Sequence, residues 1–239
     1  MNQSNQAQQQ KAMLESEHSR AEGLKHEKAG NYPQAIECFQ KALTLCPGSY
    51  NAWINMGVVL IKAQQYKAAE EAFRKVLKFS PDDTVALNNL GYVLLHSNPQ
   101  EAENIFKRYL ELKPRDVQAQ YNYSIALQQN DKSAQALDIL EQLVAQTSPQ
   151  PIILNNTGLL AFNVKNDADT AVTHITHALS LQPDLMMGWY NLAMIVAKRQ
   201  FILNDEHKRL IGMNDLGDDA NETATRLLEK ARDLGLPIE

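Results

Sequence analysis

The sequence predicts an all-α protein, a solenoid of about six helix-turn-helix units, and three observations carry this prediction. Related segments recur with a period close to 34 residues, prolines recur where a helix must end, and small residues occupy matching places in successive segments. A period of that length in a helical pattern is typical of stacked helical hairpins, which bury a continuous core between neighbours.

The second helix of each hairpin is the clearest recurring element. It begins after a short turn, continues as an amphipathic stretch and ends at a proline, as in AGNYPQAIECFQKALTLCPGS from Ala29, AQQYKAAEEAFRKVLKFSPDD from Ala63 and SNPQEAENIFKRYLELKPRD from Ser97. Proline has no N–H to donate and restricts the residue before it. We therefore place helix ends at Pro47, Pro81, Pro114 and Pro183.

The first helix of each hairpin follows the proline and has its own pattern. It reads AWINMGVVL from Ala52, ALNNLGYVL from Ala86, AQYNYSIAL from Ala119, ILNNTGLLA from Ile153 and GWYNLAMIV from Gly188. Small residues recur at one position of this helix, namely Gly23, Gly57, Gly91, Ser124, Gly158 and Ala193, and at one position of the second helix, namely Ala35, Ala69, Ala102, Ala136 and Ala171. Two small positions in each unit predict helices that cross closely, because larger side chains would overpack the crossing.

The repeats divide the chain into consecutive segments. We expect a polar N-terminal extension, either a frayed start of the first helix or a disordered segment, then five units and a divergent sixth with an insertion and a C-terminal capping helix. The expected bounds are 1–15 for the extension and 16–49, 50–83, 84–116, 117–150, 151–185 and 186–239 for the units.

Three units depart from the common length. The third is one residue short near Asn98 and Pro99, and the fifth has one extra residue near Asp169; we expect both changes in turns, where loops tolerate them. In the sixth, RQFILNDEHKRLIGMNDLGDDAN precedes the last amphipathic run. That stretch is either an insertion between two helices or a short extra helix before a terminal cap.

The recurring residues resemble those of the tetratricopeptide-repeat family over nearly the whole chain. The matching residues are Trp53, Met56, Gly57, Ala69, Phe73 and Pro81 in the second unit, and Leu87, Leu90, Gly91, Ala102, Phe106 and Pro114 in the third. The resemblance implies a right-handed superhelical α-solenoid whose first helices line a concave groove.

An asparagine recurs at one position that the resemblance places in the groove: Asn55, Asn89, Asn122, Asn156 and Asn191. A carboxamide offers both a donor and an acceptor, so such a ladder can hydrogen-bond the backbone of an extended peptide. It resembles the asparagine ladder in the repeat domain of the O-linked N-acetylglucosamine transferase. The alternative is that these asparagines hold neighbouring helices together.

Further groove positions complete the predicted peptide-binding site. They carry amides and aromatic rings at Asn88, Asn155, Tyr92, Tyr121, Phe162 and Tyr190, and aliphatic side chains at Ile54, Val58, Ile125, Leu159 and Met194. Aromatic side chains dominate binding hot spots, so this mixture favours a ligand with apolar anchors. Family members that clamp chaperone tails do so with a set of lysine and arginine side chains. The corresponding positions in this chain carry Arg20, Leu24, Asn55, Val85 and Asn89, of which only Arg20 is basic. Binding of chaperone tails is therefore disfavoured.

The composition argues against two classes of partner, nucleic acid and the membrane interior. The 239 residues are 44% hydrophobic and carry 23 basic and 28 acidic side chains, a net charge of −5 that disfavours nucleic acid. No stretch approaches the roughly 18 apolar residues of a membrane helix, and no secretory signal is recognisable. We expect a cytoplasmic protein without membrane insertion, with Cys38 and Cys46 as reduced packing thiols.

No catalytic or metal-binding motif is recognisable. His174 and His177 share a helix face at i, i+3, yet no third ligand lies near them, and the pair is interpreted as structural. There is no phosphate loop, nucleophile elbow or HExxH motif. We expect a non-enzymatic protein without cofactor or metal.

The sequence therefore favours an adaptor or scaffold that binds an extended or helical segment of another protein in its groove. Two alternatives remain open: a structural subunit that self-assembles into homo-oligomers, and a subunit that recruits substrates for a separately encoded enzyme. The sequence does not name the partner.

Overall fold

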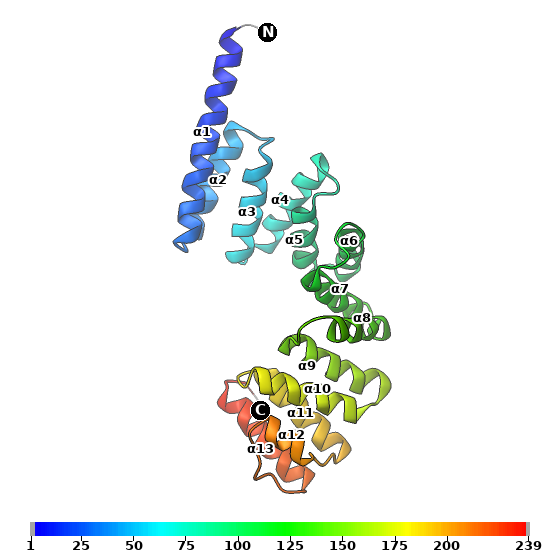
Figure 1. Ribbon diagram of the computed structural model, residues 1–239. Coiled ribbons are helices and arrows are strands. Elements are labelled where there is room, and N and C mark those ends of the chain that lie inside the picture. The colour runs from blue at the N-terminus through cyan, green and yellow to red at the C-terminus, as the bar shows by residue number, and fades with distance from the viewer. Residues whose placement is uncertain (1–2, 238–239) are drawn as a thin grey trace. The chain divides into compact units, whose positions relative to one another are not determined.

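The structure is a computed structural model and describes residues 3–237 (Figure 1). Within these residues all regular secondary structure is helical. The α-helices are α1 (Gln3–Lys28), α2 (Tyr32–Leu45), α3 (Tyr50–Lys62), α4 (Tyr66–Phe79), α5 (Thr84–Leu94), α6 (Pro99–Leu112), α7 (Val117–Gln129), α8 (Ser133–Gln146), α9 (Pro151–Leu160), α10 (Ala168–Leu181), α11 (Met186–Arg199), α12 (Asp205–Leu210) and α13 (Ala220–Asp233), with a π-helical turn, η1 (Ala161–Lys165), after α9.

The chain divides into two compact units, unit 1 (residues 1–126) and unit 2 (residues 127–239). In unit 1, α1 pairs with α2, α3 with α4 and α5 with α6, and α2 and α4 pack on the next hairpin (Figure 1). In unit 2, α9 pairs with α10, α10 packs on α11, and α11 pairs with α13. The predicted all-α architecture of stacked helical hairpins is confirmed.

Glycine and phenylalanine set how closely the hairpins of unit 1 cross. A Cβ atom on Gly57 would lie 2.5 Å from Cζ of Phe73, and one on Gly91 would lie 2.8 Å from Cζ of Phe106. Both phenylalanine rings are fully buried, so neither has room to retreat. The small residue on the first helix therefore accommodates the aromatic ring of the second.

A repeated side-chain contact closes the turn between units. The indole Nε1 of Trp53 donates to the carbonyl oxygen of Pro47 at 2.8 Å, and Trp189 makes the same contact with Pro183 at 2.8 Å. At the equivalent place in α7, Nε2 of Gln120 donates to the carbonyl of Pro114 at 2.6 Å. An N–H donor six residues after the proline is thus the shared feature, whether tryptophan or glutamine supplies it.

The extra residue of the fifth hairpin lies in a helix, not in a turn as expected. Gln64, which has positive φ, lies seven positions after Gly57, whereas the equivalent Asn166 lies eight positions after Gly158. The π-turn η1 lies between Gly158 and Asn166. A π-turn holds one more residue than an α-turn, so the first helix absorbs the insertion before the chain reverses.

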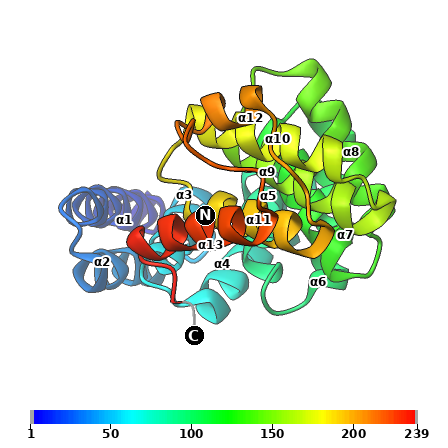
Figure 2. The same ribbon diagram turned by 90° about the horizontal axis from the view of Figure 1, so that it is seen from below.

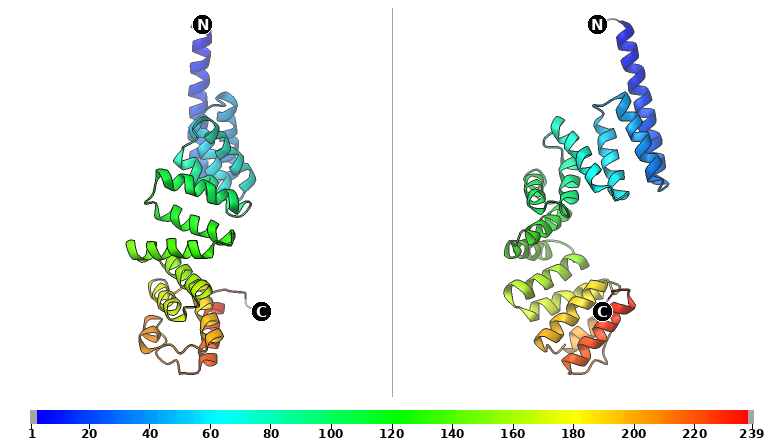
Figure 3. Two further views of the ribbon diagram at one scale, coloured as in Figure 1. Left: turned by 90° about the vertical axis from the view of Figure 1, so that its right-hand side faces the viewer. Right: turned by 180° about the vertical axis from the view of Figure 1, so that it is seen from behind.

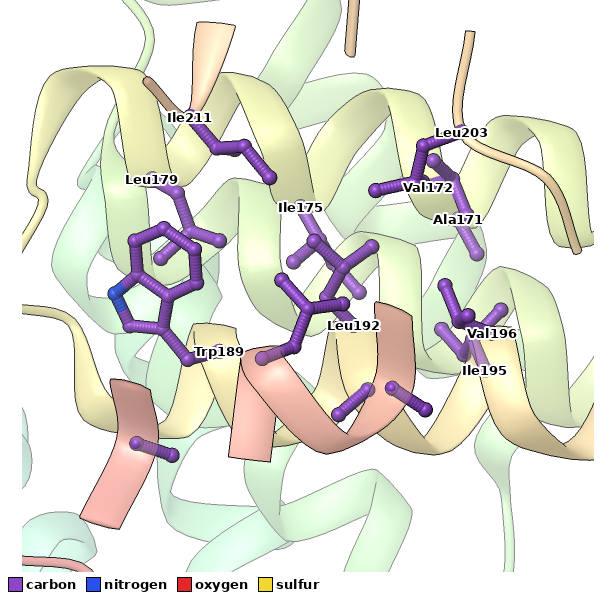
Figure 4. Close-up of a cluster of buried hydrophobic side chains, with 14 of the residues drawn as sticks. Ala171, Val172, Ile175, Leu179, Trp189, Leu192, Ile195, Val196, Leu203 and Ile211 are labelled. Carbon is purple, nitrogen blue, oxygen red and sulfur yellow. The ribbon is translucent and has the colours of Figure 1, made fainter. Parts of the chain in front are cut away.

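The divergent C-terminal region contains a short helix, α12, between the paired helices α11 and α13. Figure 2 shows α12 beside α10 and α13 along α11. Leu203 and Ile211, which flank α12, join the buried cluster of unit 2 beside Val172 and Leu179 (Figure 4). The insertion therefore contributes to the core and is not a loose loop.

The N-terminal extension continues α1, which begins at Gln3 and extends past the end of α2 (Figure 3). From residue 5 onward, the first buried side chain of α1 is Ser16, whose Oγ donates to the carbonyl of Ala42 at 2.8 Å. Met13 and Leu14, before it, are exposed. Met1 and Asn2 lie outside the described residues.

Candidate functional site

A cavity of about 310 Å3 lies in unit 2 between the first helices of its last two hairpins, α9 with η1 on one side and α11 on the other. Its lining includes five residues that the sequence placed in the groove and three that it did not name. The lining residues are Leu159, Phe162, Asn163, Tyr190, Asn191, Met194, Ile195 and Lys198. The cavity is the candidate site and is called the unit 2 pocket.

Helical spacing brings these side chains to one face. Leu159 and Phe162 are three residues apart, and Tyr190, Met194 and Lys198 follow one another at four-residue intervals along α11. Phe162 lies in the π-turn, so the insertion sets where its ring sits. Met194, at 44% exposure, is the accessible apolar side chain of α11 at the pocket.

Three asparagines form a hydrogen-bonded chain at the unit 2 pocket, and one of them, Asn191, belongs to its lining. Nδ2 of Asn191 donates to Oδ1 of Asn155 at 3.1 Å, and Nδ2 of Asn155 donates to Oδ1 of Asn156 at 3.2 Å. Asn155 and Asn191 are 2% and 5% exposed. The hydrogen bond between Asn191 and Asn155 therefore joins α11 to α9.

The asparagines of unit 1 also differ from one another. Nδ2 of Asn89 donates to the carbonyl of Val85 in its own helix at 2.8 Å, and Oδ1 of Asn122, which is buried, accepts from Nε2 of Gln118 at 3.2 Å. Asn55 is half-buried. Oδ1 of Asn88 is buried and has no hydrogen-bond partner among the described residues. A ladder of equivalent, accessible amides is therefore not supported.

The four predicted aromatic residues fall into two pairs. Tyr92 is exposed on α5 and Tyr121 is half-buried on α7, both in unit 1. Phe162 and Tyr190 both line the unit 2 pocket, where Phe162 is almost fully covered and Tyr190 is half-buried. Unit 2 thus brings its two aromatic groove residues together around one cavity.

The charge at the unit 2 pocket is positive. Nζ of Lys198 lies 5.4 Å from the centroid of the Phe162 ring, and Cζ of Arg199 lies 5.6 Å from it. Both distances fall within the range of cation–π attraction. Lys165, in the same π-turn as Phe162, is instead paired with Glu141 at 2.6 Å. Within residues 3–237 no acidic side chain pairs with Lys198 or Arg199.

Sequence reasoning missed Asn163, Ile195 and Lys198. Lys198 could have been predicted, because it lies one helical turn after Met194, which the sequence already placed in the groove. Asn163 had none, since its place depends on the π-turn. Ile195 is buried and reaches the lining from the core side of α11.

The described residues contain no group of three His, Cys, Asp or Glu side chains able to hold a metal ion. His174 is half-buried, and burial, helped by the charge of His177, lowers its pKa. None of the helices in residues 3–237 combines the length and the apolar character that a membrane span requires.

Comparison with known proteins gives the chain a family. The tetratricopeptide-repeat model matches residues 27–90 and 93–153, more than half of the chain. The solved structure of pilF from Pseudomonas aeruginosa covers 94% of this chain and 97% of its own, with a TM-score of 0.68 and 19% identity. YrrB, described as a tetratricopeptide-repeat protein with an unusual peptide-binding site, covers 76% and 90%, with a TM-score of 0.63 and 22% identity.

Two curated relatives match over part of their length. The human protein O-mannosyl-transferase TMTC3 is 26% identical over 170 residues, 69% of this chain and 18% of its own. Protein FlbA of Caulobacter vibrioides is 24% identical over 95 residues, 40% of this chain and 16% of its own. The chain spans less than a fifth of either relative.

The fold and the family agree with each other. Helical hairpins with a glycine facing a phenylalanine, a proline at the end of the second helix and a period near 34 residues recur through the matched region. Repeats of this kind typically form non-catalytic modules for protein interaction. The chain belongs to the tetratricopeptide-repeat family.

Proposed function

We propose that this protein is a non-catalytic interaction module that binds an extended or helical segment of another protein through the unit 2 pocket. The observation that carries the proposal is the convergence of groove positions Leu159, Phe162, Tyr190 and Met194 around one cavity. The peptide-binding site for which YrrB is described lies in a protein of the same fold, which supports this reading.

The size of the cavity indicates what it accepts. At about 310 Å3 it lies at the low end of the range for ligand pockets, roughly 300–1,000 Å3. Its lining is mainly aliphatic and aromatic, with polar groups at Asn163, Asn191 and Lys198. Such a cavity suits one large apolar side chain, with the rest of the segment lying along α9 and α11.

The test uses peptides selected from a random display library on the whole protein, with affinities measured by fluorescence anisotropy. Met194→Gln keeps the side-chain length, helix propensity and net charge but makes the pocket polar. We expect it to weaken binding about tenfold, because the anchor loses apolar contact.

The matched control is Ile202→Gln, an exposed apolar residue of unit 2 outside the pocket lining. It should leave affinity unchanged. If Met194→Gln folds and binds the selected peptides as tightly as wild type, the unit 2 pocket is not the binding site.

A further inference from the structure

We infer that the unit 2 pocket selects segments in which the apolar anchor is accompanied by an aspartate or glutamate. This inference rests on the proposed function and adds the chemistry of the partner. The two cations over the Phe162 ring, Lys198 and Arg199, are the observation that carries it.

Within residues 3–237 the two cations have no anionic partner, whereas three other basic residues of unit 2 do. Lys165 pairs with Glu141, Lys208 with Asp218 at 3.3 Å and Arg226 with Asp215 at 2.7 Å. Lys198 and Arg199 contact an aromatic face instead. A ring face holds a cation in place but does not neutralise it.

Lys198 and Arg199 are the last two residues of α11, and hydrogen bonds hold this end of the helix in place. Gln200, which follows α11, donates from Nε2 to the carbonyl of Ala197 at 2.9 Å and to Oδ1 of Asn221 at 3.0 Å. The second bond joins the end of α11 to the start of α13. Cations at a helix C-terminus are also favoured by the helix dipole. Less ordering is therefore needed when a ligand binds there.

The local charge is opposite in sign to that of the whole protein. The chain carries a net charge of −5, yet the one charged side chain that the described residues contribute to the pocket lining is Lys198, and Arg199 follows it. Lys198 and Arg199 are exposed, so solvent screens their attraction for a carboxylate beside the anchor, and the expected gain is that of a surface ion pair. Ammonium and guanidinium groups both form charge-assisted hydrogen bonds with carboxylates. The complementary occupant is thus an acidic, apolar segment.

The test compares short synthetic peptides that share a central phenylalanine and differ in the flanking residues, which are glutamate, glutamine or lysine. Binding to the whole protein is measured by fluorescence anisotropy at low and high salt. We expect the glutamate peptide to bind about threefold to tenfold more tightly than the glutamine peptide, with the difference shrinking in high salt. The lysine peptide should bind most weakly.

A charge-matched pair of variants identifies the cations responsible. The double variant Lys198→Gln, Arg199→Gln should lose the preference for glutamate. The control is the double variant Arg209→Gln, Lys230→Gln, which removes two exposed basic residues of unit 2 outside the pocket lining and should keep the preference. A third peptide set with glutamine flanks and a free or amidated C-terminus separates side-chain from terminal carboxylates.

The outcomes separate this inference from the proposed function. Equal affinity for glutamate and glutamine peptides, with binding still sensitive to Met194→Gln, overturns the charge preference and leaves the pocket as the binding site. A preference that only the terminal carboxylate produces also overturns it. If no peptide binds, or if binding is insensitive to Met194→Gln, both proposals fail together.

Discussion

At the scale of single residues, this protein is organised by pairs in which one member is small because the other is large. Gly91 faces Phe106 and Gly57 faces Phe73, and in each pair the ring occupies the space of the missing Cβ. The glycines are therefore needed for close approach. Gly57 and Gly91 lie inside regular helices with ordinary negative φ, where alanine would otherwise favour the helix by about 1 kcal/mol.

We predict that Gly91→Ala destabilises unit 1 by about 1–3 kcal/mol despite the better helix propensity of alanine. The new Cβ would lie 2.8 Å from Cζ of Phe106, whose ring is fully buried. Chemical denaturation of wild type and variant measures the change. Gly48→Ala is the control, because a Cβ there meets nothing within 4 Å. A stability equal to wild type would show that Phe106 has room to move.

At the scale of elements, the insertion in the last hairpin shows how extra sequence acquires a structural role. Helix α12 is short, and its N-cap Asn204 accepts a hydrogen bond at Oδ1 from the backbone N–H of His207 at 2.8 Å. The His207 side chain is buried near Phe201, and its Nδ1 has no partner in the described structure. Burial lowers the pKa of His207, although Glu206 and Asp169 oppose the shift.

We predict that acidification destabilises unit 2 through this helix. A lower pKa in the folded state means that the unfolded chain binds the proton more readily. The fold therefore keeps its full stability above the unfolded pKa of about 6.5 and loses stability as the pH falls below it. Thermal unfolding at about pH 7.5 and about pH 5.5 should show a smaller pH effect for His207→Leu than for wild type.

The leucine variant should also be at least as stable as wild type at neutral pH, since it removes a buried nitrogen without a partner. His174, whose pKa is also lowered by burial, leaves some pH dependence in the variant. His96→Leu, at an exposed site in unit 1, is the control. An unchanged pH effect in His207→Leu would rule out His207 as the source.

At the scale of the whole molecule, stability is distributed among neighbouring hairpins. Within each unit, neighbouring hairpins pack on one another, and in such arrays the free energy of unfolding is close to a sum of local contributions. The buried clusters of the described residues follow this pattern: one gathers side chains from η1, α10, α11, α13 and the segments flanking α12 within unit 2, and further clusters lie within unit 1. A local change should therefore act mainly on its own unit.

We predict that the two tryptophans report separate unfolding transitions. Trp53 lies in unit 1 and Trp189 in unit 2, and the chain has no others. The Trp189→Phe variant keeps Trp53, and the Trp53→Phe variant keeps Trp189. The change of fluorescence in urea therefore reports the unfolding of unit 1 in the first variant and of unit 2 in the second. Gly91→Ala should lower the midpoint seen by Trp53 and leave that seen by Trp189 nearly unchanged. Equal shifts in both signals would instead establish a single cooperative transition.

Much of the fold could be predicted from the sequence because its determinants are local and repeated. The period, the prolines and the paired small positions recur in unit after unit, so the hairpins and their order follow from the chain alone. Part of the candidate site follows in the same way. Leu159, Phe162, Tyr190 and Met194 were placed in the groove by repeat position, and they line one cavity.

Tertiary structure alone decided which of the remaining candidates are accessible. Asn89 and Asn191 occupy the same repeat position, yet Asn89 hydrogen-bonds within its own helix, while Asn191 is buried against Asn155. The π-turn and the docking of α12 were likewise invisible in the periodicity. The physical reason is that a repeat position fixes the direction of a side chain on its helix, whereas burial and partners depend on the neighbouring helices that pack against it.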